Sequence, residues 1–449
     1  MRTDPGPRSA GTEPRHVDLL GVGIGPFNLG LAALADRVEG LDAVFLDSGQ
    51  SFSWHPGVML AGTTLQVPFL ADLVTMADPT NPYSFLNYLH TRGRLLRFFF
   101  HERFLVPRAE FDAYCRWVTD RLDSCRFGHT VTAVRPAGEG WIVEADGPLG
   151  RQRWTADHVV MGIGTRPWLP DCALEHRGPT VLHTADYLRH RDRALDAASV
   201  TVIGSGQSSG EVFCDLLEQQ PSSGSRLDWF TRSRGFLPME YSKLGLEHFS
   251  PEYTRYFHGL PEDRRDEVRV GQDLLYKGLS TDTSARIYDL LYERTVDAAD
   301  PPVSYRSACD LRSIEPGDDD GWRLGLHHVD EDRAFGHGTE VVIVGTGYEP
   351  RPLPVDKGVM ALDSCDRPVV ELDYRVRRVD GERSTLFVQN GELHTHGVGA
   401  PDLTLGTTRN AVILNAVCGR DVHPVPERTV FQSFGAPPAP SAHPTIGPT

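Results

Sequence analysis

Two glycine-rich turns have the residue types and spacing best suited to chemistry. Gly23, Gly25 and Asn28 follow an apolar run near the start of the chain, and Gly204 and Gly206 follow another in its middle. Glycine permits a tight turn and the close approach of a pyrophosphate, which the free N–H groups and dipole of the next helix attract. The sequence therefore predicts two dinucleotide sites. Because Asn28 stands where a third glycine is expected, a turn without ligand remains the alternative for the first.

The residues that end the next strands distinguish the two nucleotides. The strand after the first turn ends in Asp47, whose carboxylate can accept hydrogen bonds from a ribose hydroxyl. The strand after the second turn ends at Arg232, and Arg234 follows two residues later. Guanidinium groups suit a bidentate contact with a 2′-phosphate, which predicts NADPH rather than NADH. The alternative is that Arg232 is a solvated surface charge.

A long segment, residues 52–89, separates the first turn from ordinary α/β sequence and contains Trp54, His55 and Gln66. A loop of this length inside a compact domain is usually functional or disordered, and this one is too apolar to be disordered. We therefore interpret it as the wall of an active site. The alternatives are that His55 is a packed, hydrogen-bonded ring, Gln66 an ordinary buried amide and Trp54 a core aromatic.

Two dinucleotide sites on one chain imply electron transfer between two cofactors, and the economical assignment is FAD at the first site and NADPH at the second. A flavin reduced by NADPH can pass its electrons to a disulfide, a quinone or oxygen. The seven cysteines contain no CxxC pair for the disulfide route, and the sequence lacks an amphipathic basic anchor for a membrane quinone. Oxygen remains as the expected acceptor.

The elements that must position these residues indicate an α/β fold with a Rossmann-like FAD domain and an inserted Rossmann-like NADPH domain. Residues 340–350 (EVVIVGTGYEP) resemble the earlier strand HVVMGIGTRP and are expected to return the chain to the first domain. The expected divisions are an FAD-binding domain at 16–197 and 340–432 with the active-site loop 52–89, an NADPH-binding domain at 198–339 with a helical substrate-side insertion at 243–300, and disordered ends at 1–15 and 433–449.

Composition excludes several classes of function. The chain has 449 residues, 40% of them hydrophobic, and a formal net charge of -16, which argues against nucleic acid and anionic membrane as partners. It contains no apolar run near the ~20 residues of a membrane span and no signal-peptide segment. The cysteines are scattered, and no His/Cys/Asp cluster has metal-ligand spacing. We expect a cytoplasmic protein with no bound metal.

Several long segments resemble the lysine/ornithine N-monooxygenase family of hydroxamate-siderophore biosynthesis. The resemblance extends from about residue 17 to residue 420. The segments that carry it are FSWHPGVML, LQVPFLADLVTMADPTNPYSFLNYL, FLVPRAEFDAYCRW, GSGQSSGE, GTGYEP and NGELHTHGVGAPDLTL.

This resemblance implies flavin-dependent N-hydroxylation of a small substrate. NADPH reduces FAD, oxygen adds to give a C4a-hydroperoxyflavin, and a neutral primary amine attacks the distal oxygen. NADP⁺ stays bound and shields the intermediate from water. Since a free alkylammonium has a pKa near ~10.4, the site must lower that pKa by desolvation or favour alkaline pH. Relatives are often dimers or tetramers, so a homo-oligomer is expected.

The resemblance also assigns residues by position. Trp54, His55 and Gln66 line the flavin and are the candidate catalytic residues. Thr404 closes the pocket near the ring system and is also a candidate substrate contact. The candidate cofactor-binding residues are Gly23, Gly25, Pro26, Asn28, Asp47, Trp54, His55, Gln66, Gly204, Ser205, Gly206, Gln207, Ser208, Arg232, Arg234, Asn390 and Thr404.

The chain departs from the amino-acid hydroxylases of the family at the substrate. Their segment FLKDL carries a lysine that contacts the substrate α-carboxylate, and here that position is Ala71. An asparagine that makes a second carboxylate contact aligns with Leu246. A buried carboxylate without a counter-charge costs several kcal/mol, so these changes predict a substrate that has none. Glu247 is the candidate partner for a distal ammonium.

The predicted substrate is therefore a diamine, with cadaverine ahead of putrescine because residues 66–89 resemble cadaverine hydroxylases. One methylene changes binding by only ~1–3 kcal/mol, so chain length stays open. The alternatives are hydroxylation of lysine or ornithine with another residue in place of the lysine, a flavin disulfide or quinone reductase, and a non-catalytic flavin-binding scaffold.

Overall fold

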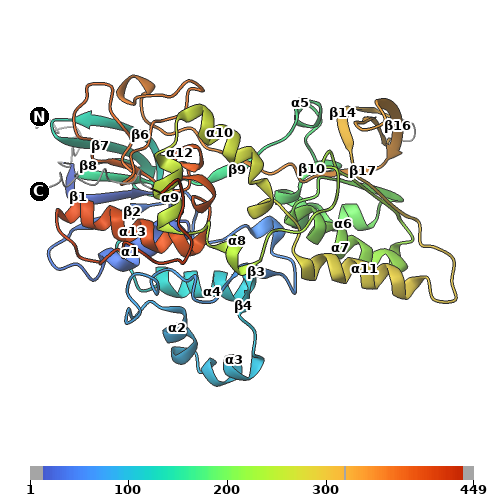
Figure 1. Cartoon of the computed structure of the whole chain (residues 1–449), viewed down its shortest axis with the longest axis horizontal. Helices are drawn as coiled ribbons and strands as arrows, with labels where there is room; N and C mark the ends of the chain where they lie inside the picture. Colours follow the sequence, from blue (N-terminus) through green and yellow to red (C-terminus); the bar gives the residue numbers. More distant parts are fainter. Residues whose placement is uncertain (1–13, 318–319, 438–449) are drawn as a thin grey trace, which may run out of the picture.

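Two separate β-sheets organise the chain (Figure 1). The structure is a computed structural model that describes residues 14–317 and 320–437. The expected disordered ends lie largely outside these residues, at 1–13 and 438–449. No helix in the described part of the chain is long and apolar enough to cross a membrane.

The first sheet has seven strands in the order β5-β2-β1-β8-β7-β6, with β19 paired to β8. Its parallel centre is formed by β1, β2 and β8, and β8 is long enough to pair with β7 through its first half and with β19 through its last three residues. The strands are β1 (Arg15–Val22), β2 (Ala43–Leu46), β5 (Cys125–Arg126), β6 (Thr130–Ala137), β7 (Gly140–Gly147), β8 (Gly150–Met161) and β19 (Leu386–Val388).

Helix α1 (Pro26–Ala35) is the central helix of this half, and it is buried from Asn28 to Ala35. It is apolar on all sides because it lies between the sheet and the helices α4 (Arg108–Thr119) and α13 (Leu403–Cys418). Each fully buried leucine in such a position stabilises the fold by roughly 1.5–3 kcal/mol. This packing fixes the start of α1, and with it the first glycine-rich turn.

The second sheet has five parallel strands in the order β10-β17-β11-β12-β13. Its helices include α6, α7 and α11 (Figure 1), and a three-stranded antiparallel sheet, β14-β15-β16, adjoins it. The elements are β10 (Val181–His183), α6 (Tyr187–Leu195), β11 (Ser199–Ile203), α7 (Gln207–Ser223), β12 (Arg226–Phe230), α11 (Thr281–Arg294), β13 (Val303–Arg306), β14 (Cys309–Pro316), β15 (Trp322–His328), β16 (Arg333–Thr339) and β17 (Val341–Val344).

The expected boundaries of the second domain, 198 and 339, are wrong at both ends. Strand β17 pairs with β11 and β10, so residues 341–344 belong to the second sheet rather than to the first. The chain crosses between the sheets along β9 (Thr165–Pro167) and β18 (Tyr348–Pro350), which pair with each other. The sequence similarity between residues 340–350 and the segment HVVMGIGTRP could not show this. Both strands are buried and are followed by glycine, so only their pairing distinguishes them.

The helical insertion expected at 243–300 is divided between the two halves. Helix α11 packs on α7 of the second sheet, whereas α9 and α10 contact α12 near the end of the first sheet. Tyr253 and Phe257 of α9 share a small core with Val398. The remaining elements of this region are α8 (Lys243–Leu246), α9 (Pro251–His258), α10 (Glu262–Gly271), η3 (Asp273–Leu275), η4 (Lys357–Val359), α12 (Leu393–His396) and η5 (Gly397–Gly399).

Helices α2 (Phe85–Thr91) and α3 (Leu95–His101), at and after the end of the active-site loop 52–89, lie below both sheets in Figure 1. The chain forms an antiparallel pair, β3 with β4, and a pair of short helices that projects away from the sheets. The elements are η1 (Pro56–Val58), β3 (Thr64–Pro68), α2 (Phe85–Thr91), α3 (Leu95–His101) and β4 (Leu105–Pro107), with α5 (Asp171–Leu174) and η2 (Thr184–Asp186) following β9.

Candidate functional site

The first glycine-rich turn has the geometry of a phosphate cradle. Gly23 has φ +87°, and a Cβ there would stand 2.4 Å from the carbonyl oxygen of Gly162. At Gly25, which precedes α1, an added Cβ would meet no described atom within 4 Å. No described side chain caps this helix. Open space in front of uncapped backbone N–H groups fits the pyrophosphate of a dinucleotide.

The second turn repeats this geometry at α7. Gly204 has φ +115°, and its added Cβ would stand 2.3 Å from the carbonyl oxygen of Gly345. Gly206 precedes the helix, with no capping side chain in the described part and no described atom within 4 Å of an added Cβ. Ser208 lies half-buried in the first turn of the helix. The two turns therefore fit two dinucleotides equally well.

Asn28 has a structural role that its place in the motif did not suggest. Its side chain is 0% exposed, and Nδ2 donates to the carbonyl oxygens of Val22 (3.1 Å) and Gly23 (2.8 Å). Gln389 donates to its Oδ1 at 2.8 Å. With no surface left for a ligand, this side chain joins the carboxyl end of β1 to the end of β19. It holds the turn in place instead of contacting a cofactor itself.

Asp47 stands at the end of β2, beside the first turn, as expected. Its Oδ2 accepts from the N–H of Ile24 at 2.7 Å and its Oδ1 from the N–H of Gly49 at 2.7 Å. These bonds orient the carboxylate toward the turn, and each oxygen keeps a lone pair for a ribose hydroxyl.

The two arginines predicted to contact a 2′-phosphate differ in their surroundings. Thr231 donates to Ser205 Oγ at 3.0 Å, so the end of β12 lies against the second turn and Arg232 follows it directly on the surface. Arg234 is exposed and forms an ion pair with Asp330 at 3.1 Å. Arg232 is therefore the better placed of the two for a phosphate.

Gln207, assigned to the nucleotide from sequence, is occupied by protein contacts. Its Nε2 donates to Glu211 (2.7 Å) and to Thr283 Oγ1 (3.0 Å), and its Oε1 accepts from the N–H of Ser280 (2.7 Å). The side chain ties the start of α7 to the start of α11. Its contribution to the cofactor site is to position the helix.

Aromatic rings line the wall between the two sheets. Trp54 makes edge contacts with His55 at 5.1 Å and with Phe111 at 5.2 Å between ring centroids. Tyr348 lies between His55 (6.1 Å) and His183 (5.2 Å). Desolvation of the ring lowers the pKa of His55, and the charge of Arg108 lowers it further. His55 is therefore neutral at pH 7 and a weak base.

We expect acid to destabilise the fold through His183. Its Nδ1 accepts from the N–H of Ala185 (3.0 Å) and its Nε2 donates to the carbonyl oxygen of Gly347 (3.0 Å), an arrangement that requires a neutral ring. Burial lowers its pKa to about 4. The unfolded chain, with a histidine pKa near ~6.5, takes up the proton first, so stability falls between about pH 6.5 and 4, by up to ~1.4 kcal/mol per pH unit. Thermal melts at pH 7.5 and 5 measure this loss.

The control for that experiment is His183→Asn, because the asparagine Oδ1 can still accept from Ala185. The variant should lose less stability than the wild type when acidified. An equal loss in both proteins would assign the effect to other groups.

Gln66 lies in β3, half-buried, and a residue that the sequence did not indicate holds it. The hydroxyl of Tyr241 lies 3.0 Å from the Gln66 carbonyl oxygen and 3.0 Å from its Oε1. Tyr241 belongs to the loop after β12, so it comes from the second half of the molecule. Only long-range pairing creates this contact, and no sequence signal could have revealed it.

A buried ion pair connects the segment from Asn390 to Thr404 with helix α13. Arg409 of α13 contacts the carboxylate of Glu392, and the two side chains are 2% and 0% exposed. The Arg409 guanidinium also stacks over Phe27, 4.4 Å from the ring centroid. Asn390 has φ +58°, and Thr404 is in the first turn of α13. Neither Glu392 nor Arg409 was anticipated, because charged residues in sequence are ordinarily surface groups.

Ala71 lies where the first dinucleotide turn, the active-site loop and α13 meet. It is 2% exposed and lines, with Pro26 and Phe111, a cavity of about 10 Å³, which has room for about one water molecule. No lysine, arginine or histidine is among the described residues that line it. The lining residues are Pro26, Phe27, Ala71, Asp72, Leu73, Phe111, Leu403, Gly406, Thr407 and Asn410.

The other three predicted substrate contacts, Leu246, Glu247 and Thr404, are not among the described residues that line this cavity. Leu246 ends the short helix α8 and is 36% exposed. The Glu247 carboxylate accepts from the backbone N–H groups of Phe431 (3.1 Å) and Gln432 (2.7 Å). Glu247 therefore holds the C-terminal segment, and its prediction as an ammonium partner is not supported by its contacts.

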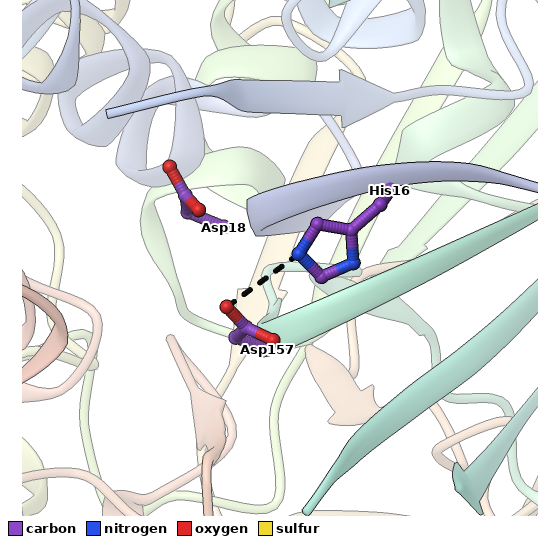
Figure 2. Close-up of side chains that lie close together, drawn as sticks. All are labelled: His16, Asp18 and Asp157. Carbon is purple, nitrogen blue, oxygen red and sulfur yellow. Dashed lines mark ion pairs between the residues drawn. The ribbon is translucent and has the colours of Figure 1, made fainter. Parts of the chain in front are cut away.

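One group of possible metal ligands comes together outside this region. His16, Asp18 and Asp157 place ligand atoms within 4.8 Å of one another, and His16 Nε2 lies 3.6 Å from Asp157 (Figure 2). The group is largely exposed and lies near the start of β1, away from the glycine-rich turn at its carboxyl end. We assign no function to it.

The family model for L-lysine 6-monooxygenase/L-ornithine 5-monooxygenase matches residues 15–350. This chain belongs to that family. The rhizobactin siderophore biosynthesis protein RhbE of Rhizobium meliloti is 45% identical over 96% of this chain and 97% of its own. A putrescine N-hydroxylase of Shewanella oneidensis is 40% identical over 93% of this chain and 84% of its own. The crystal structure of DfoA bound to FAD, a cadaverine monooxygenase of Erwinia amylovora, matches with a TM-score of 0.90 and 39% identity, covering 94% and 99% of the two chains.

Family membership confirms the predicted two-dinucleotide fold and the class of enzyme. The chain is a flavin-dependent N-hydroxylating monooxygenase of a family that uses FAD and NADPH. The alternatives of a disulfide or quinone reductase and of a non-catalytic flavin scaffold are thereby set aside.

Proposed function

We propose that this enzyme hydroxylates one terminal amine of a small aliphatic diamine, cadaverine ahead of putrescine, for a hydroxamate siderophore. The observation that carries the proposal is Ala71, buried and apolar beside the first dinucleotide turn, in a cavity whose described lining holds no cation. The printed names of relatives, among them a putrescine N-hydroxylase and a cadaverine monooxygenase, support a diamine.

An amino-acid substrate would be penalised if its α-carboxylate came to lie beside Ala71. Arg409 is the nearest buried cation on α13, but Glu392 already neutralises it. A carboxylate buried without a counter-charge costs on the order of 3 kcal/mol, which corresponds to ~100-fold in binding. A diamine has no such group.

The residues assigned to the cofactors follow from the two turns. Gly23, Gly25 and Asp47 would hold FAD, and Gly206 and Arg232 would hold NADPH. When bound, FAD reduced by NADPH would activate molecular oxygen, of which one atom goes to the amine and the other leaves as water.

The chain's own contribution is a dry site for a neutral amine. The buried ring of Phe111 and the half-buried ring of Trp54 shield this side of the site from water, and neutral His55, which is exposed, does not repel an ammonium. Asp72 offers no free oxygen to the substrate, because its carboxylate accepts from the N–H groups of Val74, Thr75 and Phe85. Since Asp72 is the one carboxylate among the described residues that line the cavity and its oxygens are occupied, desolvation must release the amine proton, and we expect kcat/KM to rise with pH toward the amine pKa.

The test is a comparison of hydroxylamine formed per NADPH consumed with cadaverine, putrescine, lysine and ornithine. Both diamines should exceed both amino acids by ~100-fold in kcat/KM, because only the amino acids bury a carboxylate. Pentylamine is the control for recognition of the distal ammonium. Lysine as the best coupled substrate would contradict the proposal.

A further inference from the structure

A buried ion pair joins the two halves of the molecule next to both cofactor sites. Arg108, at the start of α4, donates from Nη1 and Nη2 to the two carboxylate oxygens of Glu211 in α7, at 2.7 and 2.8 Å. The side chains are 13% and 4% exposed. A bidentate pair with two short, charge-assisted hydrogen bonds fixes both the distance and the orientation of the elements that carry it.

Each partner is bound in turn to a segment of the active site. Arg108 Nε donates to the carbonyl oxygen of Thr64 at 3.2 Å, in the strand that carries Gln66. Glu211 accepts from Gln207, the first residue of α7, and Gln207 binds Ser280 and Thr283. A continuous series of hydrogen bonds therefore runs from the flavin-side strand β3 to the helix that begins at the nucleotide turn.

The pair is not needed to hold α7 on its own sheet. Phe213 of that helix already stacks on Trp229 of β12, with 4.6 Å between ring centroids, and Val212 lies in the same buried core. What Arg108 adds is a charged contact between the halves, beside the chain crossings at β9 and β18 and the hydrogen bonds from the Tyr241 hydroxyl to Gln66. Burial raises the pKa of Glu211, while the Arg108 charge opposes that shift and keeps the carboxylate paired.

We propose that Arg108 and Glu211 are positioning residues for hydride transfer, which set the NADPH-binding helix relative to the flavin-side wall. Neither group needs to touch a cofactor. Loss of the pair lets the second half shift, and the nicotinamide then approaches the flavin in the correct geometry less often. The inference rests on the proposed placement of the two cofactors but not on the identity of the amine.

The experiment is anaerobic stopped-flow reduction of the FAD-loaded enzyme by NADPH, without amine. Glu211→Gln keeps the size of the side chain but removes the charge and turns one of the two acceptor oxygens into an N–H donor, so the bidentate pair with Arg108 is lost. We expect the limiting rate of flavin reduction to fall between about tenfold and a hundredfold, since misplacement of reacting groups by about 1 Å costs that much. The Kd for NADPH should change less than the limiting rate.

Two further variants separate positioning from folding. Arg108→Gln combined with Glu211→Gln leaves no uncompensated buried charge, so this protein should fold and bind FAD yet reduce as slowly as the single variant. Glu218→Gln removes the exposed pair of Glu218 with Arg286, which joins the same α7 to α11, and should reduce at the wild-type rate.

A wild-type reduction rate in Glu211→Gln and in the double variant would overturn the inference, whatever happens to melting temperature. Because no amine is present, that result is distinct from a failure of the diamine proposal, which is read from product formation by the wild type.

Discussion

Replacing Gly25 by aspartate is expected to abolish FAD binding, and the same replacement at Gly206 to leave FAD bound but abolish reduction by NADPH. Both glycines precede a helix with φ near -79°, which any L-residue can adopt, and an added Cβ meets no described atom within 4 Å at either. The new carboxylate can cap the helix, worth ~1 kcal/mol, so folding is retained. It also occupies the anion site and repels the pyrophosphate.

We expect each affinity to fall by at least ~100-fold, because an unpaired like charge at short range costs several kcal/mol in a partly desolvated site. Flavin absorbance of the purified protein reports the first loss, and NADPH-dependent bleaching reports the second. Gly336→Asp, at an exposed strand position with equal space, is the control and should match the wild type. If Gly206→Asp lost FAD instead, the assignment of the two nucleotides would be reversed.

The glycine turns could be predicted because their chemistry is local in sequence. A turn, a helix start and the residue that ends the next strand lie within some 30 residues, so Gly23, Gly25 and Asp47 could be related without a structure. The same holds for Gly204, Gly206 and the strand that ends before Arg232. In the structure, Ser205 and Thr231 bring the two parts of the second site together.

The features that sequence could not supply depend on pairing between distant segments. Strand β17 has the same buried pattern whichever sheet it joins, so the domain boundary was misplaced. Arg108 and Glu211 are 103 positions apart, and no motif in the sequence relates them to each other. Glu247 was predicted to be available for a substrate ammonium because Phe431, whose N–H it binds, lies 184 residues away in the sequence.

Asn28 shows how a correct motif can still misassign a residue. Its position in the turn predicted contact with a ligand, but its amide satisfies buried backbone groups where strand ends meet. A third glycine would leave these carbonyl groups unpaired, which costs ~1–3 kcal/mol each. At this position the departure from the glycine pattern serves the fold.

Ala71→Lys is expected to eliminate diamine turnover, with kcat/KM reduced by at least ~100-fold. Ala71 is 2% exposed in the cavity that contains Pro26 and Leu403, so the lysine ammonium would have to lie in or beside the substrate space. Asp72 has no free oxygen to bind it directly, since its carboxylate already accepts from Thr75 and Phe85. The ammonium would then repel the charged end of a diamine and offer a counter-charge to the α-carboxylate of lysine or ornithine.

The matched control is Ala71→Met, which places a chain of similar length in the cavity without a charge. If size alone decides, both variants lose diamine turnover equally and neither gains activity on lysine. If charge decides, as we expect, only Ala71→Lys shifts the ratio of lysine to cadaverine turnover, and high salt restores little because the groups are buried. Diamine kinetics unchanged in Ala71→Lys would mean that this position does not face the substrate, and the diamine assignment would lose the observation that carries it.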